Sequence, residues 1–455
     1  MSIPSRQQPL NDWIEWLLHL HPTEIDLGLK RVRSVAERMG LLTAGRLSRK
    51  VMTVAGTNGK GSSVAMLSAI YDAAGYRVGS YTSPHLLRFN ERIQINQAPV
   101  DDQMIIDAFA EIEVARGETK LTYFEFSTLA ALKIFAEAAL DVVVLEVGLG
   151  GRLDAVNIVD ADVALITAID VDHIDWLGDD RSQIAIEKAA ILRANQWAAC
   201  SDPNPPQTLA ETARAKQANL FQLGKHFKFS QNPQSCQDEY RDLDNAGLGK
   251  LAKSWDFVAL DSALQSVEDL PVPALAGDFQ LQNAAGVLAA LQGLQADLPV
   301  SEKAIHQGLR QVKHLGRLQW LKVAGQDWLL DVAHNPQSAG VLADYLQQTG
   351  LRFSDAVFSV LADKDSLPMV KQLVPFVEHW HIAPLVDVRA LDLERLQQLL
   401  QQAGVADECV SIYPDVATAV NAVQTKGCER VLALGSFFTV GAVLSALSVM
   451  GSSDE

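Results

Sequence analysis

The chain has few cysteines, a shortage of positive charge and no long hydrophobic run. Its four cysteines (Cys200, Cys236, Cys409 and Cys428) are scattered and form no C-x-x-C pair, so we expect buried, reduced thiols in a cytoplasmic protein. No stretch reaches the roughly 18 consecutive apolar residues of a membrane-spanning helix, so we expect no membrane partner. The N-terminus lacks a basic segment followed by an apolar core, which argues against a signal peptide and favours an amphipathic helix.

Acidic residues outnumber basic ones, 55 against 38, and the formal net charge is −17. Because nucleic-acid affinity comes mainly from clustered lysine and arginine, this balance argues against a nucleic-acid partner. An anionic small molecule can still bind in a locally positive pocket or through a metal ion. The rest of the composition, 48% hydrophobic and 20% charged, is typical of a soluble globular protein, and the length of 455 residues predicts two domains.

Short apolar runs alternate with helical patterns between about residues 50 and 300. Helical patterns at 62–75 and 127–140 separate runs of strand length, which are apolar enough to be covered on both faces. These runs are 50–56, 76–84, 141–148 and 161–170. The alternation predicts an α/β domain of the P-loop type, with a mostly parallel, doubly wound sheet.

The pattern weakens and then returns in the second half of the chain. Residues 200–270 are polar and irregular, and we expect loops and a few short strands there. A helix at 283–294 leads to a linker near 295–300. Further strands are expected at 327–334, 355–363, 377–385 and 430–436. We therefore predict a first domain over residues 1–297 and a smaller C-terminal α/β domain over residues 298–455.

The stretch "AGTNGKGSS" follows the first predicted strand and has the character of a phosphate-binding loop with altered spacing. The common pattern places a glycine five residues before the Gly-Lys pair and Ser or Thr directly after it, but Val54 and Gly61 occupy these positions. Gly56, Gly59 and Gly61 still let backbone N–H groups approach an anion where a helix begins, and Lys60 adds a point charge. This context predicts phosphate binding; the alternative is a strand-to-helix turn whose lysine is merely solvated.

Chemically useful residues follow four of the predicted strands. Ligands of open parallel sheets bind beyond the carboxyl ends of the strands, so residues placed there meet at one edge. The candidates are Lys60, Ser83, His85, Glu146, Asp172 and His173. Each alone also fits an ordinary solvated or packed position, but their common placement favours a shared site.

Several motifs together resemble one enzyme family. They are "AGTNGKGSS", "TSPHLLRFNERIQ", "LTYFEFSTLAAL", "LEVGLGGRLDAVN", "DHIDWLG", "EKAAI" and "DVAHNP". The chain is similar to the folylpolyglutamate synthase/dihydrofolate synthase family of Mur-type ligases, from "EIDLGLKR" to "LGSFFTVG". "GTNGK" and "DVAHNP" are shared across Mur-type ligases, whereas "LTYFEF" with "EVGLGGRLDAVN" is more specific to the folate branch. The resemblance implies a C-terminal domain like that of the Mur ligases, which adds glutamate.

The resemblance also implies an ATP and metal site. ATP contacts are implied at Thr57, Asn58, Gly59, Lys60, Asn283, Arg317, Asp331 and His334. Mg²⁺ ligands are implied at Ser83, Glu146 and His173, with a second Mg²⁺ on Lys188, modified by CO₂ to a carbamate. A monovalent cation such as K⁺ is a further expected cofactor. The expected catalytic residues are Lys60, His173, Lys188 and Arg317.

The residues alone leave three points of this site open. For the metal, Mn²⁺ or Zn²⁺ fits as well as Mg²⁺, because imidazole is an unusual ligand for Mg²⁺. For Lys188, the alternative is a helix-surface lysine paired with Glu187 or Asp180. The family usually has Pro where this chain has Leu315, so we expect the turn that presents Arg317 to be looser than in the family pattern.

The family's pterin-bearing substrate would contact three segments of this chain. They are Ile25, Asp26 and Leu27; Thr122, Tyr123, Phe124 and Glu125; and Leu153, Asp154 and Ala155. Aromatic walls beside a carboxylate and backbone groups suit a flat ring with hydrogen-bonding edges. Without the resemblance, "LTYFEF" also fits an ordinary amphipathic segment.

The activity that the resemblance implies is ATP-dependent ligation of L-glutamate through an acyl phosphate. The acceptors would be dihydropteroate, giving dihydrofolate, and the γ-carboxylate of reduced folates, giving folylpolyglutamates. We expect a cytoplasmic monomer. Two alternatives are a Mur-type ligase that acts on a cell-wall precursor and an ATP-driven switch protein that is not a ligase.

Overall fold

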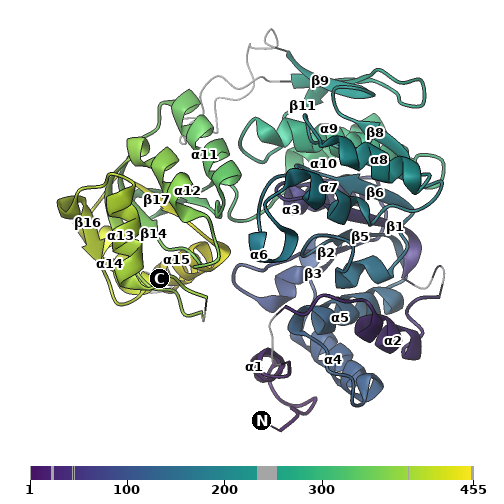
Figure 1. The fold of residues 1–455 in the computed structure, drawn as a ribbon, viewed down its shortest axis with the longest axis horizontal. Helices are drawn as coiled ribbons and strands as arrows, with labels where there is room; N and C mark the ends of the chain where they lie inside the picture. Colours follow the sequence, from purple (N-terminus) through teal and green to yellow (C-terminus); the bar gives the residue numbers. More distant parts are fainter. Residues whose placement is uncertain are drawn as a thin grey trace. The chain divides into compact units, whose positions relative to one another are not determined.

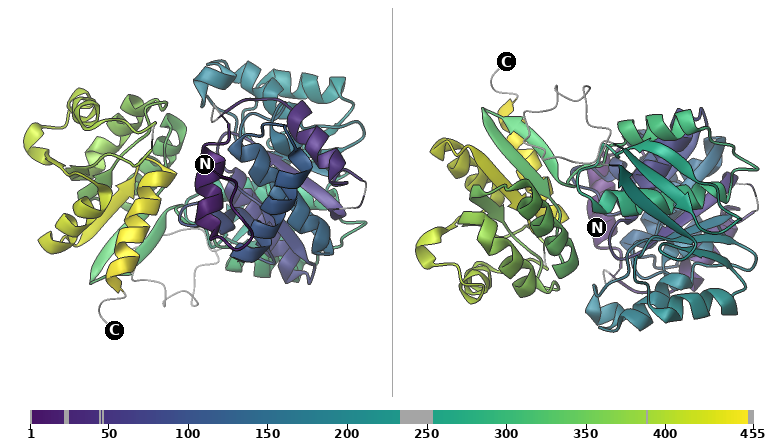
Figure 2. Two further views of the ribbon diagram at one scale, coloured as in Figure 1. Left: turned by 90° about the horizontal axis from the view of Figure 1, so that it is seen from below. Right: turned by 90° about the horizontal axis from the view of Figure 1, so that it is seen from above.

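The computed structural model describes residues 2–21, 25–43, 45, 47–232, 254–387 and 389–451. These residues form two compact units (Figures 1 and 2). The first contains Met1–Asn232, Ser254–Ala274 and Leu281–Val312, and the second contains Leu275–Gln280 and the chain from Lys313 onward. Each unit is built around its own large sheet.

The first unit is built on an eight-stranded sheet in the order β4-β3-β2-β5-β1-β6-β7-β8. The strands are β1 (Ser48–Ala55), β2 (Val78–Tyr81), β3 (Ile93–Ile95), β4 (Ala98–Pro99), β5 (Leu140–Glu146), β6 (Val163–Ile166), β7 (Trp197–Cys200) and β8 (Asn219–Gln222). All neighbouring pairs from β2 to β8 are parallel, and only the pairs β2–β3 and β3–β4, at one edge, are antiparallel. The carboxyl ends of β1, β2, β5 and β6 therefore lie side by side, as the sequence predicts.

Helices cover both faces of this sheet (Figure 1). They are α1 (Leu10–Leu18), α2 (Lys30–Arg38), α3 (Lys60–Ala73), α4 (Asp102–Arg116), α5 (Tyr123–Glu137), α6 (Ile174–Leu177), α7 (Arg181–Ala189), α8 (Gln207–Ala215), α9 (Phe279–Gln292) and α10 (Glu302–Gln311). Apolar residues of α1, α2, α4, α5, α7 and α8 form one buried cluster with the strands. Helices α3, α9 and α10 lie on the other face, where Gly286 of α9 approaches Ser201 and Leu165. Burial on both faces explains the nearly continuous apolar strands.

The first unit extends further along the chain than the predicted boundary at residue 297. Helix α10 packs on α3 so closely that a Cβ atom at Gly308 would lie 2.6 Å from the Ile70 Cα. Because α10 belongs to the first unit, the structure divides the chain after Val312. The linker expected near 295–300 lies inside the first unit for the same reason.

The described residues between 200 and 270 contain more structure than the expected loops and few short strands. Helix α8 is followed by β8, which is one edge strand of the eight-stranded sheet. A small antiparallel sheet follows in the order β11-β10-β9. Its strands are β9 (Phe227–Asn232), β10 (Ser254–Ala259) and β11 (Val267–Pro271). The sequence conceals this sheet because most residues of β9 and β11 are exposed or half-buried and polar.

The second unit has a six-stranded sheet in the order β12-β13-β17-β14-β15-β16. The strands are β12 (Gln319–Val323), β13 (Gln326–Asp331), β14 (Phe353–Phe358), β15 (Val377–Ile382), β16 (Val410–Ile412) and β17 (Arg430–Leu434). The helices are α11 (Pro336–Thr349), α12 (Ser366–Leu373), α13 (Leu393–Gln402), α14 (Val416–Lys426) and α15 (Phe437–Gly451). Only β12 is antiparallel to its neighbour. The predicted fold, a doubly wound α/β domain and a smaller α/β domain, is confirmed.

Within the described residues, the cysteines are free thiols: Cys200 and Cys428 are buried and Cys409 is half-buried. Cys236 lies outside the described residues. None of the described helices combines the length and the hydrophobicity that crossing a membrane would need.

Asp355 on β14 is a fully buried carboxylate in the second unit. Its Oδ1 accepts hydrogen bonds from His381 Nε2 at 2.8 Å and from Lys426 Nζ at 2.7 Å. Burial alone would raise the pKa of Asp355, but hydrogen bonds from His381, Cys428 and Lys426 outweigh it and hold the pKa well below its ordinary value. The carboxylate therefore stabilises the folded second unit in its charged form.

We expect Asp355→Asn to lower the free energy of unfolding by about 3 kcal/mol, because breaking a buried ion pair leaves its partners unpaired. Since the folded-state pKa lies below 3.8, this stabilisation is present above that pH and is lost as the pH falls through the folded-state pKa. Denaturant titrations at pH 7 and at acidic pH measure the difference. Asp344→Asn, at an exposed position of α11, is the control and should change stability by less than about 0.5 kcal/mol. Equal stability of wild type and Asp355→Asn at pH 7 would contradict the prediction.

Candidate active site

The predicted phosphate-binding loop joins β1 to α3, and its glycines are required by close contacts. Gly56 and Gly59 have positive φ angles of 156° and 91°. A Cβ atom at Gly56 would lie 1.8 Å from Thr167 Oγ1, and one at Gly59 would lie 2.4 Å from Asn283 Oδ1. Helix α3 begins at Lys60, so the loop presents backbone N–H groups at a helix N-terminus. Asn283, predicted to contact ATP, thus lies against the loop.

Hydrogen bonds tie the loop to the segment that follows β6. Thr57 N donates to Ala168 O at 2.6 Å, and Thr57 Oγ1 donates to Asp170 O at 2.8 Å. Thr167 Oγ1 donates to Asn58 O at 2.8 Å. The Lys60 ammonium is half-buried and donates to the carbonyls of Gly56 and Thr57, at 3.0 and 3.1 Å. Lys60 is therefore held over the loop, which contradicts the alternative of a merely solvated lysine.

Two of the predicted metal ligands lie together at the ends of β2 and β5. Glu146 is buried, and its Oε2 accepts a hydrogen bond from Ser83 N at 3.3 Å. His173 is half-buried and adopts a left-handed conformation, φ 53°, directly before α6. The described residues contain no group of three or more His, Cys, Asp or Glu side chains arranged to hold a metal. The predicted set of Ser83, Glu146 and His173 contains only two residues of these types, and its oxygen donors suit a hard divalent cation.

Lys188, in the last turn of α7, is buried with 3% of its surface exposed. Burial, and then the positive charge of Lys60, lower the pKa of Lys188 to about 7, while Asp172, Asp154 and Glu187 act in the opposite direction. Lys188 thus lies near the predicted ATP residue Lys60 and the predicted pterin residue Asp154, and the neutral amine is accessible near pH 7.

The alternative of a helix-surface Lys188 is wrong, because the side chain is buried. Glu187 Oε1 accepts from Arg152 Nε at 2.8 Å. The Asp180 carboxylate caps α7 instead, accepting from Ser182 N at 2.8 Å.

The predicted pterin segment 153–155 is shaped by the buried carboxylate of Asp154. This side chain accepts hydrogen bonds from Leu149 N at 2.8 Å and Val156 N at 3.0 Å, and it caps the short helix Ala155–Ile158. Burial raises the pKa of Asp154 to about 6, against the opposing backbone hydrogen bonds. Leu153 is half-buried and Ala155 is buried. Asp154 therefore holds the loop after β5 in addition to any contact with a ligand.

Two other predicted pterin residues, Asp26 and Glu125, are joined by Arg31. Arg31 Nη1 lies 2.7 Å from Asp26 Oδ2, and Arg31 Nη2 lies 3.2 Å from Glu125 Oε1. Glu125 Oε2 also accepts from Thr122 N at 2.8 Å, closing a capping box at the start of α5. Ile25 and Leu27, on either side of Asp26, are half-buried. Sequence reasoning missed Arg31, because its two acidic partners are far apart in the chain.

Arg92 is a second residue that the sequence did not single out. Its guanidinium lies 5.3 Å from the centre of the Tyr123 ring, and its Nε donates to His85 Nδ1 at 2.8 Å. Burial and then Arg92 lower the pKa of His85 to about 3, so the imidazole is neutral. Phe124 packs against Gly148, where a Cβ atom would lie 2.6 Å from the ring. The two aromatic rings predicted to contact the pterin, Tyr123 and Phe124, are therefore packed against neighbouring residues of the first unit.

The second unit brings together the three residues predicted there for ATP. Asp331, at the end of β13, is buried and accepts from Leu318 N at 2.9 Å and Ala333 N at 2.8 Å. The Arg317 guanidinium lies 5.2 Å from the Phe437 ring centre, and the His334 ring lies 5.9 Å from it. Phe437, which sequence reasoning missed, thus lies near two predicted ATP residues, Arg317 and His334. Leu315 is 45% exposed, beside this turn.

This combination of units and loop chemistry belongs to a class of ATP-using ligases. Residues 54–291 match the Mur ligase middle domain, and residues 316–437 match the glutamate ligase domain of Mur ligases. The second matched range begins at residue 316, close after Val312, whereas the first ends at residue 291 and leaves α10 outside the match.

Individual relatives identify one family within this class of ligases. The dihydrofolate synthase/folylpolyglutamate synthase of Escherichia coli K12 is 40% identical over 452 residues, 99% of this chain and 98% of the relative. The enzyme of the same name from Haemophilus influenzae is 37% identical, with coverage of 95% and 96%. The chain belongs to the dihydrofolate synthase/folylpolyglutamate synthase family of Mur-type ligases, which confirms the resemblance seen in the motifs.

Solved structures of relatives are similar over nearly the whole chain. E. coli FolC in complex with DHPP and ADP superposes with a TM-score of 0.85 at 38% identity, covering 99% of this chain and 100% of that one. A bifunctional folylpolyglutamate synthase/dihydrofolate synthase with Mn, AMPPNP and L-glutamate bound gives a TM-score of 0.84 at 39% identity, with coverage of 98% and 100%.

Proposed function

We propose that this chain is an ATP-dependent ligase that joins L-glutamate to dihydropteroate and to the γ-carboxylate of reduced folates. The products are dihydrofolate in the first reaction and folylpolyglutamates in the second. The observation that carries the proposal is the edge of the first sheet, where a preformed phosphate loop, the Ser83–Glu146 pair and buried Lys188 are grouped. Relatives that match nearly the full length carry both activity names.

In the first step, a carboxylate oxygen of the pteroate or folate attacks the γ-phosphorus of ATP. The bond from that phosphorus to the ADP oxygen breaks, and an acyl phosphate forms. Lys60 and Arg317 neutralise charge on the phosphoryl oxygens, Lys60 as a point charge and Arg317 through its planar fork. Asn58, Gly59 and the N-terminus of α3 supply backbone N–H groups to the phosphates.

In the second step, the amine of L-glutamate attacks the acyl carbon. The new C–N bond forms, the C–O bond to phosphate breaks, inorganic phosphate leaves and the nitrogen loses a proton. Because an acyl phosphate hydrolyses readily, water has to be excluded while it exists. Asn283, Asp331 and His334 hold the nucleotide during both steps.

Ser83, Glu146 and His173 would hold a Mg²⁺ ion, which supplies positive charge to the phosphate oxygens when bound. For the pterin, Asp26 and the aromatic pair Tyr123 and Phe124 are the proposed contacts, fixed by Arg31 and Arg92. The second metal site, the monovalent cation, the monomeric state and the cytoplasmic location stay predictions.

Lys188 is proposed to react with CO₂ as the neutral amine. The nitrogen forms a bond to carbon and releases one proton, leaving a carbamate with two anionic oxygens. Burial of the side chain and the nearby Lys60 charge favour the neutral amine that this reaction needs. A charged lysine ammonium has no lone pair to offer a metal ion. The carbamate, in contrast, presents oxygen atoms that can coordinate one.

Release of phosphate from ATP tests the proposed function. A ligase should release phosphate only when L-glutamate and a pteroate or folate are both present, in an amount equal to the amide formed. Parallel assays with dihydropteroate and with a reduced folate, followed by mass spectrometry of the products, measure the two activities. Equal phosphate release from ATP alone would instead indicate a switch protein, and a product made only from a cell-wall precursor would indicate a different Mur-type ligase.

A further inference from the structure

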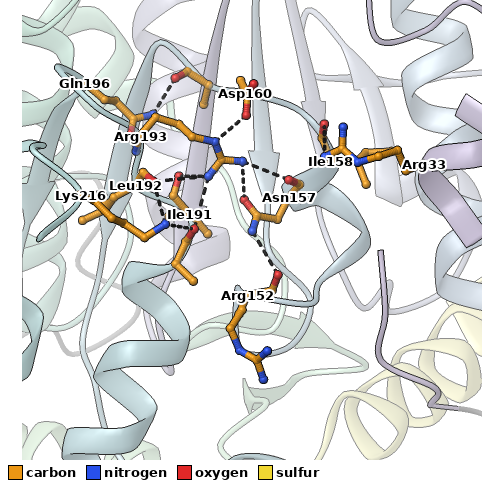
Figure 3. A network of polar contacts seen from close by, with 12 residues as sticks. Arg33, Arg152, Asn157, Ile158, Asp160, Ile191, Leu192, Arg193, Gln196 and Lys216 are labelled. Atoms are coloured by element: carbon orange, nitrogen blue, oxygen red, sulfur yellow. Dashed lines mark hydrogen bonds and ion pairs between the residues drawn. The ribbon is translucent and has the colours of Figure 1, made fainter. Parts of the chain in front are cut away.

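The end of α7, directly after Lys188, is held by an arginine. The last carbonyls of a helix have no partner within the helix, so the turn after α7 needs donors from elsewhere. Arg193 Nη1 donates to Ala190 O at 3.3 Å and to Ile191 O at 2.9 Å (Figure 3). A positive charge at this end also complements the helix dipole.

The same guanidinium reaches the loop that carries Asp154. Arg193 Nη2 donates to Asn157 O at 3.1 Å and to Asn157 Oδ1 at 2.9 Å, and Nε donates to Asp160 Oδ1 at 2.5 Å (Figure 3). Asn157 is buried and its Nδ2 donates to Arg152 O at 3.3 Å. One planar group therefore bridges the turn after Lys188 and the segment after Asp154.

The loop and the helix also touch at Lys188 itself. A Cβ atom at Gly151 would lie 2.6 Å from Glu187 O and 3.2 Å from the Lys188 Cα. Arg152 pairs with Glu187 beside this contact, at 2.8 Å. Because no side chain fits at Gly151, the separation of the two segments at this point is narrowly defined.

We propose that Arg193 is a positioning residue for the ligase reaction, because it fixes Lys188 relative to the loop that carries Asp154. The inference rests on the proposed role of Lys188. Arginine suits this position since its rigid fork of donors satisfies the turn and the loop at once, whereas a lysine ammonium is a single point. Arg193 itself touches no reacting atom in this proposal.

Lys216 offers a matched control. Its ammonium donates to Ala190 O at 3.0 Å and to Leu192 O at 3.1 Å, so it supports the same turn as Arg193. These hydrogen bonds go to the turn and not to the Asn157 loop (Figure 3). A variant at Lys216 therefore weakens the end of α7 while leaving the bridge in place.

The experiment compares Arg193→Lys, Asn157→Ala, their double variant and Lys216→Met in the full-length protein. We expect Arg193→Lys to lower kcat about tenfold or more, since displacements of about 1 Å are costly to catalysis. KM for ATP should change less than about twofold, because Thr57 and Thr167 tie the phosphate loop to the segment after β6, and the hydrogen bonds of Arg193 described above go to neither. Lys216→Met should lower the melting temperature but keep kcat within about twofold of wild type. The double variant should be no slower than the slower single variant, because both substitutions break one bridge.

Unchanged kcat in Arg193→Lys would overturn the inference, and so would an equal loss of kcat in Lys216→Met, which would reduce Arg193 to a helix-end contact. Lys188→Ala separates this result from the proposed function. If Lys188→Ala is inactive while Arg193→Lys is fully active, only the positioning role fails. If Lys188→Ala keeps wild-type activity, the role of Lys188 fails and the positioning role fails with it.

Discussion

Lys60→Ala is expected to lower kcat for ligation by about a hundredfold or more, because it removes one positive charge that stabilises the transferring phosphoryl group. The Lys60 hydrogen bonds described here go to the carbonyls of its own loop, at Gly56 and Thr57, so the hydrophobic core is untouched. We therefore expect a cooperative thermal transition close to that of wild type. Steady-state kinetics of phosphate release, with both co-substrates saturating, measure the effect.

Lys303→Ala is the matched control for Lys60, since this lysine is exposed on α10. It should retain activity within about twofold of wild type, as expected for a surface substitution away from the site. If Lys60→Ala keeps more than about a tenth of wild-type activity, the phosphate-binding role of this loop is refuted.

Lys188→Ala is expected to be nearly inactive and to regain part of its activity when a small carboxylate such as acetate is added. The substitution removes the nitrogen that would carry the carbamate, and acetate can place two carboxylate oxygens in the space left behind. Removing a buried amine should not unfold the protein, because a desolvated ammonium is costly to bury. Rates with and without acetate, together with the ¹³C spectrum of wild type in labelled bicarbonate, test the prediction.

The wild type serves as the control for rescue, since acetate should not accelerate it. A carbamate carbon signal should be present in wild type and absent in Lys188→Ala. Full activity of Lys188→Ala without acetate, or a wild-type spectrum with no such signal, would contradict the carbamate. Both outcomes leave the separate role of Lys60 open to its own test.

The first sheet was predictable because its strands are buried on both faces and are apolar throughout. Strand β5, for example, follows directly from the run at 141–148, and the glycines of the phosphate loop mark the turn into α3. The small sheet β9–β11 could not be predicted, because strands with exposed polar residues carry no clear hydrophobic period. Helix α10 looks like the start of a new domain in the sequence, and only its packing on α3 assigns it to the first unit.

Prediction of the candidate site from the sequence is limited in the same way. Residues that follow strands, such as Glu146, were found because topology places strand ends together. Arg31 was missed, since its partner Glu125 is 94 residues away and no local pattern joins them. The burial of Lys188 was equally hidden, because the sequence around it allows a surface helix as well as a buried one. Pairings between distant segments are a property of the packed fold and not of any short stretch.

The hydrogen bonds between the phosphate loop and residues 167–170 have a thermodynamic consequence. Fixing the backbone of a residue costs roughly 1–2 kcal/mol in conformational entropy, and here that loss accompanies the folding of the first unit. A nucleotide therefore meets a loop that is already ordered, and its binding free energy is not reduced by ordering it. The stability of residues 167–170 and the affinity of the phosphate loop for a nucleotide are therefore linked, although the two segments are far apart in the sequence.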